Sequence, residues 1–264
     1  MPASEPPSES PSEYDVESLD HPLWFTLNGP QSTFGTANRN AVRFLPDVST
    51  LAALAPGAES EAWADLYDLV APGDYVALFF FDPPPPFPDT PLLRVVYEGD
   101  YDQMVCCETQ SMSTSSHLTT SNYLTTRSTP IVALGPIDAA EMLALVQLTE
   151  PGPFALRTPE VGRYLGVKSG PGKLVAMAGE RARLPGWVEI SAVCTHPDYR
   201  GRGYAERLVR ELCTDSIASG NGLFLHVRSD NHVARRAYER IGFTVRRSFK
   251  VIAVQHPRPH KDPA

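Results

Sequence analysis

The sequence predicts an α+β protein with two folded regions. Both regions alternate segments of helical spacing with apolar runs of strand length. The Ser- and Thr-rich residues 109–129 separate the regions and are typical of a linker or long loop. The 264-residue chain is 42% hydrophobic, which is sufficient for a substantial core. We therefore expect a disordered Pro-, Ser- and Glu-rich tail over residues 1–19, a smaller α+β domain over 20–108, a larger domain over 130–254 and a tail over 255–264.

The first region contains two helical and two strand patterns. Residues 48–55 and 61–70 have the apolar spacing of helices, whereas residues 75–81 and 92–97 have that of strands. Four consecutive prolines, residues 83–86, lie between the strand patterns and favour a stiff connector inside the domain.

The second region has a regular order of elements. Strand patterns cover residues 131–134, 164–167, 173–178, 187–194 and 223–227. Helical spacing covers residues 139–148, 204–219 and 232–241, with Asp138 as a possible N-cap of the first helix and Gly242 as the C-cap of the last. Residues 243–254 close the region as one or two further strands.

A turn between a strand and a helix has the composition of a phosphate site. It reads Arg200-Gly201-Arg202-Gly203 and precedes the helical pattern that Tyr204 begins. Glycine lets the backbone approach a ligand closely, and the N-terminus of a helix presents unpaired N–H groups and positive potential. The two arginines add fixed positive charge, or they are simply solvated.

Charge is distributed unevenly along the chain. Residues 1–127 carry a net charge of −14 and residues 128–264 one of +6, for a total of −8. The basic half contains the glycine turn, which favours a small polyanionic ligand. An acidic chain without interleaved aromatic and basic residues argues against nucleic-acid binding.

The remaining composition predicts a cytoplasmic protein that does not associate with membranes. No apolar run approaches the roughly 20 residues of a membrane-spanning helix, and the first residues carry acids without the basic residues of a targeting segment. The four cysteines form no C-x-x-C pair. Cys194 and His196 form a lone C-x-H, and two ligands do not make a zinc site, so we expect no metal.

Two motifs together resemble the Gcn5-related N-acetyltransferases (GNAT). The string Arg200-Gly201-Arg202-Gly203-Tyr204-Ala205 is similar to the R/Q-x-x-G-x-G/A motif of that superfamily. The second signature follows at Asn231, Ala234, Ala237, Tyr238, Gly242 and Phe243. The segment VEISAVCTHPDYRGRGYA resembles the FR47-like branch of this superfamily. The resemblance covers residues 130–254 and implies a mixed, largely antiparallel sheet with helices on both faces.

The resemblance implies an acyl-CoA site, with acetyl-CoA the expected co-substrate. The backbone of Val193, Cys194 and Thr195 is expected to pair with the pantetheine arm. The pyrophosphate is expected on the N–H groups from Gly201 to Glu206. The cofactor-binding candidates are Val193, Cys194, Thr195, Arg200, Gly201, Arg202, Gly203, Tyr204, Ala205, Glu206, Asn231 and Arg235.

The resemblance also points to catalytic candidates. Tyr238 is expected to protonate the thiolate that leaves when an amine attacks the thioester. His226 and Glu189 compete as the base that accepts a proton from the amine, and a water chain is the third option. A core tyrosine and a packed strand histidine are the ordinary alternatives for Tyr238 and His226.

The function predicted is acyl transfer to a primary amine of a small molecule or peptide, within a ternary complex. The alternative is an inactive acyl-CoA-binding regulatory or scaffold module. The first region is interpreted as a smaller α+β domain, conceivably a degenerate half of the same fold, whose acidity suggests recognition of a cationic amine or shielding of the acceptor pocket.

Overall fold

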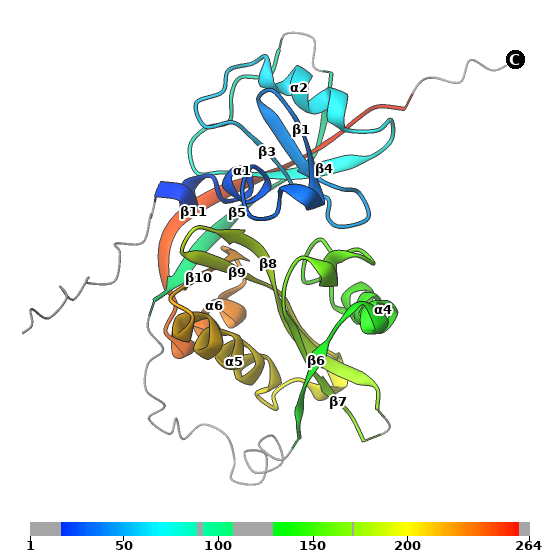
Figure 1. Ribbon diagram of the computed structural model, residues 1–264, viewed down its shortest axis with the longest axis vertical. Helices are drawn as coiled ribbons and strands as arrows, with labels where there is room; N and C mark the ends of the chain where they lie inside the picture. The colour runs from blue at the N-terminus through cyan, green and yellow to red at the C-terminus, as the bar shows by residue number, and fades with distance from the viewer. Residues whose placement is uncertain (1–16, 89–91, 108–128, 171, 259–264) are drawn as a thin grey trace, which may run out of the picture.

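The computed structural model describes residues 17–88, 92–107, 129–170 and 172–258 (Figure 1). One eight-stranded sheet runs through the molecule in the order β4-β11-β5-β10-β9-β8-β7-β6, and a three-stranded antiparallel sheet has the order β1-β2-β3. Within the large sheet only β9 and β10 pair in parallel. The expected mixed, largely antiparallel sheet is therefore confirmed.

The elements have the following bounds. The strands are β1 Gly35–Asn38, β2 Ala41–Phe44, β3 Ala52–Leu54, β4 Tyr75–Phe80, β5 Arg94–Cys106, β6 Ile131–Leu134, β7 Tyr164–Lys168, β8 Leu174–Leu184, β9 Trp187–Thr195, β10 Gly222–Arg228 and β11 Thr244–Gln255. The α-helices are α1 Pro22–Leu27, α2 Ala62–Leu69, α4 Ala139–Thr149, α5 Tyr204–Ala218 and α6 His232–Ile241. The 3-10 helices are η1 Glu17–Asp20, η2 Ser32–Phe34, η3 Pro136–Asp138, η4 Thr158–Glu160 and η5 Pro197–Tyr199.

Helices cover both faces of the sheet in the half that contains β6 to β10 (Figure 1). On one face α5 packs its apolar stripe, which includes Leu208 and Leu212, against Leu165 and Ile190 of the strands. On the other face α4 packs Met142 and Leu145 against neighbouring strand residues. Both faces of the central strands are buried as a result, and these strands hold the candidate site.

The large sheet does not stop at the expected boundary between the two regions. β4 and β5, which precede residue 108, pair with β11, and the second half of β5, from Tyr101 to Cys106, also pairs with β10. β5 therefore lies between two strands that the sequence places after residue 130. The division at residues 109–129 remains a prediction, but a single sheet crosses it.

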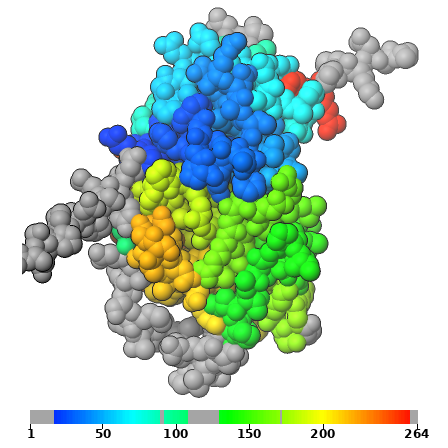
Figure 2. Space-filling view, viewed as in Figure 1, coloured from blue at the N-terminus to red at the C-terminus, as the bar shows by residue number. Residues whose placement is uncertain are grey.

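A shared hydrophobic core also joins the two parts of the chain. Leu19, Leu23 and Phe44 pack in the same cluster as Trp187 and Phe224, and all five are almost completely buried. Figure 2 shows the residues coloured blue to cyan lying directly against those coloured green to orange. Burial of such side chains stabilises the fold by about 1.5–3 kcal/mol each, so this contact holds the two parts together.

Several expected elements differ in the structure. The helix expected over residues 48–55 is wrong, because Ala52–Leu54 forms strand β3. Tertiary contacts override the helical spacing there, since β3 pairs with β2 and both Ala52 and Leu54 are buried. Helix α1 and strands β1 and β2 were not predicted. The strand expected over residues 92–97 extends to Cys106, and residues 244–255 form one strand.

The expected tails fall mainly outside the described residues. Residues 1–16 and 259–264 lie outside them, as does most of the expected linker, residues 108–128. The first tail was predicted one turn too long, because η1 begins at Glu17 and buries Leu19 completely. Among the described residues, no helix is long and apolar enough to cross a bilayer.

Candidate functional site

The candidate site begins where β9 and β10 separate. The two strands pair at only three positions, which end at Glu189 and Phe224. Beyond these positions β9 continues to Thr195 along β8, and β10 continues to Arg228 along β5. Each strand therefore presents an edge to the opening, and an extended ligand with amide groups can pair with such an edge.

A bulge in β9 directs its backbone into this opening. Ala192 has φ 53°, an uncommon conformation for a residue with a Cβ. The pairing between β8 and β9 shifts register at this point, between Met177 and Gly179. Bulges of this kind redirect strands next to binding sites. Val193, Cys194 and Thr195 follow the bulge, and their pairing with the pantetheine arm stays a prediction.

The expected phosphate turn lies between β9 and α5. Gly201 and Gly203 have φ 74° and 75°, a left-handed conformation that favours glycine. A Cβ built on Gly201 meets no atom within 4 Å, so the turn is open on that side. Helix α5 begins at Tyr204, and the first four N–H groups of a helix have no partner within it. The turn and the helix start thus fit the diphosphate of an acyl-CoA.

The charged residues of the turn are exposed. Arg200 donates to the carbonyl oxygen of Thr195 at 3.4 Å. Arg202 donates to the carbonyl oxygen of Asp198 at 3.2 Å and stacks over Tyr199 at 4.7 Å. Glu206 forms ion pairs with Arg210 and Arg240. These weak surface contacts leave both arginine side chains able to turn toward a phosphate.

A cavity of about 260 Å³ lies at the opening between β9 and β10. It brings together two predicted catalytic residues, Tyr238 and His226, with the edge of β9 at Val193. Residues from both parts of the chain line it: Leu51, Tyr75, Ala77, Phe79, Tyr97, Tyr101, Pro151, Gly152, Pro153, Arg181, Ile190, Ser191, Ala192, Val193, His226, Tyr238, Val251 and Ala253. No carboxylate is among these described residues, which gives no support to recognition of a cationic amine by acidic side chains.

Tyr238 lies on α6 and contributes its side chain to the cavity wall. Burial raises the pKa of its phenol well above the ordinary value, and the neighbouring Cys194 adds to this effect. The phenol therefore stays protonated at neutral pH, as a general acid requires. The ring also packs at an angle on Phe243, with centroids 5.9 Å apart, which fixes its orientation. The role of Tyr238 as the acid stays a prediction, and its position on the cavity wall is compatible with it.

Glu189 lies beneath the cavity in a buried ion pair. Arg181 donates to its two oxygens at 2.6 and 2.8 Å, and the His226 Nδ1 lies 2.9 Å from Glu189 Oε1. Burial alone would raise the pKa of Glu189, but Arg181 and His226 outweigh it and lower the pKa to about 2. A carboxylate with so low a pKa, engaged by two partners, is a poor proton acceptor. This geometry favours a positioning role over that of a base.

His226 is buried and both of its ring nitrogens have partners. Burial lowers its pKa below the usual value, even though the hydrogen bond to Glu189 acts in the opposite direction. The neutral ring donates from Nδ1 to Glu189, and Nε2 lies 3.2 Å from the amide nitrogen of Gln103. The Gln103 amide orientation is set by its contacts to Leu19 and Arg246. The lone pair that a base needs is therefore occupied.

Two further cofactor candidates have structural partners. The side chain of Asn231 accepts a hydrogen bond from the N–H of Ala234 at 3.1 Å and so caps helix α6. Arg235 forms ion pairs with the buried Asp102 at 2.9 Å and with Glu239 at 3.2 Å. A phosphate contact from Arg235 would have to replace the Asp102 pair, so its predicted role in cofactor binding gains no support.

Cys194 is a buried structural thiol. Burial raises its pKa to about 11, which removes the thiolate that a nucleophile requires. Among the described residues, no group of three or more His, Cys, Asp and Glu side chains is arranged to hold a metal ion.

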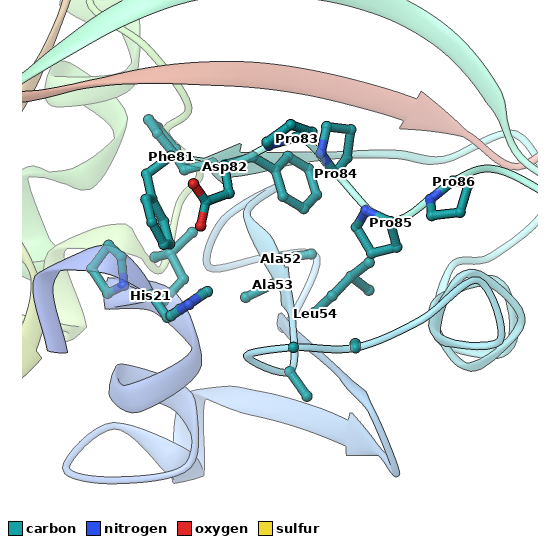
Figure 3. Close-up of a pocket in the computed structure, with 17 residues that line it drawn as sticks. His21, Ala52, Ala53, Leu54, Phe81, Asp82, Pro83, Pro84, Pro85 and Pro86 are labelled. Atoms are coloured by element: carbon teal, nitrogen blue, oxygen red, sulfur yellow. The ribbon is translucent and has the colours of Figure 1, made fainter. Parts of the chain in front are cut away.

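A second cavity, of about 320 Å³, lies between β3 and β4 (Figure 3). One isolated parallel bridge joins Leu51, directly before β3, to Ala77 of β4, and the two strands do not pair beyond it. Figure 3 shows Ala52, Ala53 and Leu54 on one side and Pro83 to Pro86 on another, with Asp82 and His21 near Phe81. The turn before α2 has acids at Glu59 and Glu61 and no basic residue. This opening thus repeats the shape of the first one without features that attract phosphate.

Sequence reasoning missed much of the cavity wall. Phe79, Tyr97 and Tyr101 come from β4 and β5, whose pairing with β10 and β11 has no local signal. Arg181 had no distinct signal, because Glu180 and Arg183 are charged residues of the same strand, β8.

Comparisons with known proteins find relatives of the part of the chain that carries this site. The FR47 family model, described as FR47-like protein, matches residues 164–251. The N-alpha-acetyltransferase RimI of Mycobacterium tuberculosis is 40% identical over 83 residues, which are 30% of this chain and 51% of the relative. The uncharacterized protein ML0378 of Mycobacterium leprae is 38% identical over 55 residues, 21% of this chain and 15% of that protein. The chain therefore spans about half or less of the curated relatives that it matches.

Solved structures extend the similarity over nearly the whole chain. A GNAT-family protein from Novosphingobium aromaticivorans is 37% identical, with a TM-score of 0.74 over 90% of this chain and 98% of that one. A GCN5-related N-acetyltransferase from Kribbella flavida shares the fold at 12% identity, with a TM-score of 0.55 over 94% of this chain and 97% of that one. Because the first relative is covered almost completely at that identity, the chain belongs to the GNAT acetyltransferase superfamily and carries an FR47-like domain.

Proposed function

We propose that this protein transfers an acyl group, with acetyl the expected one, from acyl-CoA to a primary amine in a ternary complex. The observation that carries the proposal is the meeting of three features in one place. The edge of β9 at Val193 and the phenol of Tyr238 line one cavity, and the glycine turn at Gly201–Gly203 follows directly on β9. Family membership implies an acyl-CoA co-substrate.

The residues present would hold acyl-CoA in two places. The N–H groups from Gly201 to Glu206 would hold the diphosphate, and the backbone from Val193 to Thr195 would hold the pantetheine arm. When bound, the co-substrate supplies an acyl thioester, whose transfer to an amine leaves a thiolate that needs a proton. Tyr238 keeps its proton in the cavity because burial raises its pKa, and it gives that proton to the sulfur.

The amine must lose a proton before it attacks. Glu189 and His226 are both engaged by neighbours, so we propose that the proton leaves through water in the cavity. In this arrangement Arg181, Glu189 and His226 fix the floor of the cavity between β8, β9 and β10. The acceptor then enters between the aromatic residues from the first part of the chain and the edge of β9.

An inactive acyl-CoA-binding module is the second candidate. The exposed glycine turn would serve binding alone equally well. The open cavity beside Tyr238 favours an enzyme, because a binding module has no need of space for an acceptor.

We also infer that the first part of the chain is a degenerate copy of the second. One parallel bridge, between Leu51 directly before β3 and Ala77 of β4, joins two strands that do not pair beyond it, and β9 and β10 likewise separate after their paired positions. A helix follows the first strand of each pair, α2 in one case and α5 in the other. The acceptor is expected to be a small molecule or peptide in the cytoplasm, without nucleic acid or membrane as partner.

Thermal unfolding with acetyl-CoA, CoA, ATP or NADH in large excess tests the proposal. A ligand at about 100 times its Kd adds about 2.7 kcal/mol of stability, which raises the midpoint by roughly 5–10 °C. We expect this rise with acetyl-CoA and CoA and with neither of the other two. No rise with the CoA species would contradict the proposed function. CoA release in the presence of an amine then separates an enzyme from a binding module.

A matched pair of glycine variants locates the binding. Gly201 and Gly220 have φ 74° and 78°, and neither has an atom within 4 Å of a built Cβ. Gly201→Ala and Gly220→Ala therefore carry a similar cost, about 1–2 kcal/mol, for a left-handed alanine. Only Gly201 lies in the turn. We expect Gly201→Ala alone to lose most of the midpoint rise with CoA, and equal rises in both variants would exclude the turn.

A further inference from the structure

Arg181 is the one charged side chain among the described residues that line the cavity beside Tyr238. The residue is 7% exposed, and it comes from β8, beneath the opening between β9 and β10. His226 is uncharged there, because burial lowers its pKa. A buried arginine on a cavity wall is a strong hydrogen-bond donor for whatever enters the cavity.

Two of the three guanidinium nitrogens of Arg181 are occupied by the protein. Nε and Nη2 donate to Glu189 at 2.8 and 2.6 Å. Within the part of the chain that the structure describes, Nη1 has no acceptor. Nη1 is not one of the fully buried polar atoms that lack a hydrogen-bond partner. It is therefore accessible from the cavity. Since Arg181 lines the cavity, Nη1 offers its donors to the acceptor substrate.

The charges around Arg181 select the kind of oxygen that it binds. The Arg181–Glu189 pair is neutral as a whole, and His226 adds no charge. A carboxylate from the acceptor would leave one uncompensated negative charge in a buried site, which costs several kcal/mol. A carbonyl oxygen accepts the same hydrogen bond and brings no charge. The site therefore suits an amide or ester carbonyl better than a free carboxylate.

The other walls of the cavity indicate the side chain and the size of the acceptor. Tyr75, Phe79, Tyr97 and Tyr101 form an aromatic side of the cavity. Such walls contact an apolar or aromatic side chain favourably. A sphere of about 260 Å³ is about 8 Å across. A carbonyl oxygen on Arg181 and an amine beside Tyr238 must therefore be separated by only a few bonds.

We propose that Arg181 is a specificity-determining residue whose Nη1 donates to the carbonyl oxygen of an α-amino amide with an apolar or aromatic side chain, as at the first residue of a peptide. The inference rests on the proposed function, because it assigns the acceptor of the same cavity. It assigns no proton transfer to Arg181, which orients the acceptor so that its amine faces the edge of β9.

Three matched acceptors test the assignment with the native protein. L-phenylalaninamide has the amine, ring and carbonyl; 2-phenylethylamine lacks the carbonyl; L-phenylalanine replaces the amide with a carboxylate. Loss of a hydrogen bond to a charged donor lowers kcat/KM by about 10- to 100-fold. We expect the amide to exceed each of the other two acceptors by at least about 10-fold. Equal kcat/KM for the amide and 2-phenylethylamine would overturn the proposal, as would a preference for the carboxylate.

Arg181→Lys provides a readout that a purely structural role does not move. Lysine retains the charge that pairs with Glu189 but loses the planar fork and its Nη1 donor. The ratio of kcat/KM between phenylalaninamide and 2-phenylethylamine should then fall toward 1. The rise in the thermal unfolding midpoint that phenylalaninamide causes in the absence of CoA should also become smaller. A lower rate with both acceptors at an unchanged ratio would refute recognition by Arg181.

The outcomes also separate this inference from the proposed function. If CoA raises the unfolding midpoint but none of the three amines releases CoA, the α-amino carbonyl class is refuted and the acyl-CoA site stands. If CoA causes no rise, the proposed function fails. If Arg181→Lys does not fold, the acceptor series with the native protein still decides the assignment.

Discussion

The buried pair of Arg181 and Glu189 makes a strong prediction for the Glu189→Gln variant. Glu189 is 1% exposed, and it accepts two hydrogen bonds from Arg181 and one from His226. Glutamine has the same size but leaves the charge of Arg181 uncompensated in the interior. Breaking a buried ion pair in this way costs about 3–5 kcal/mol.

The pKa of Glu189 gives an independent figure of the same size. Its pKa falls from 4.5 to about 2 on folding, and one pKa unit corresponds to about 1.4 kcal/mol, which makes about 3 kcal/mol. Because the folded pKa is the lower one, this stabilisation is present above pH 4.5 and is lost as the pH falls toward 2. The difference in stability between the native protein and the variant should therefore shrink across that window.

Thermal and urea unfolding at neutral pH measure the effect. For a chain of this size we expect a midpoint lower by roughly 6–20 °C. Glu160→Gln is the matched control, because Glu160 also pairs with an arginine, Arg157, but at the surface, where such pairs contribute about 0–1 kcal/mol. Replacing both partners, as Arg181→Met with Glu189→Leu, should recover much of the loss. Equal midpoints for Glu189→Gln and Glu160→Gln would refute the reasoning.

Three further predictions concern catalysis and the cofactor. Tyr238→Phe should lower kcat by about 10² or more while the midpoint rise with acetyl-CoA persists; unchanged turnover would exclude Tyr238 as the acid. Arg235→Ala should lower stability by about 1–3 kcal/mol, because Asp102 is buried and, within the described part of the chain, keeps only the hydroxyls of Ser229 and Ser248 as side-chain partners. An unchanged stability with a lost CoA response would instead assign Arg235 to a phosphate. The pH dependence of kcat/KM should follow the pKa of the acceptor amine when that amine is varied, because both nitrogens of His226 are engaged; a fixed pKa across acceptors would restore a protein base.

Local sequence signals predicted the phosphate turn and the elements beside it. Gly201 and Gly203 are needed for the left-handed turn, and α5 and α6 have caps or apolar faces that the sequence displays. Tyr238 was found because its helix carries a recognisable signature. These features depend on residues close together in the chain, which is why sequence patterns are sufficient to find them.

The rest of the site depends on contacts between distant residues. β5 pairs with β10 and β11, more than 100 residues later, and so brings Tyr97 and Tyr101 to the cavity and Gln103 to His226. No periodicity within β5 indicates its partner strands. The structural roles of Asn231 and Arg235 were missed for a related reason: a motif identifies a residue type at a position, whereas the folded chain determines which atom its side chain meets.

The position of β11 has a consequence for synthesis of the chain. β11 lies between β4 and β5, which do not pair with each other, and it follows both of them in the chain. Until residues 244–255 leave the ribosome, the nascent sheet has a vacant place with an unpaired strand edge on each side. Such edges attract other chains. Closure of this sheet therefore waits until residues 244–255 have been made, and a nascent chain stalled before Thr244 would be a natural client for chaperones.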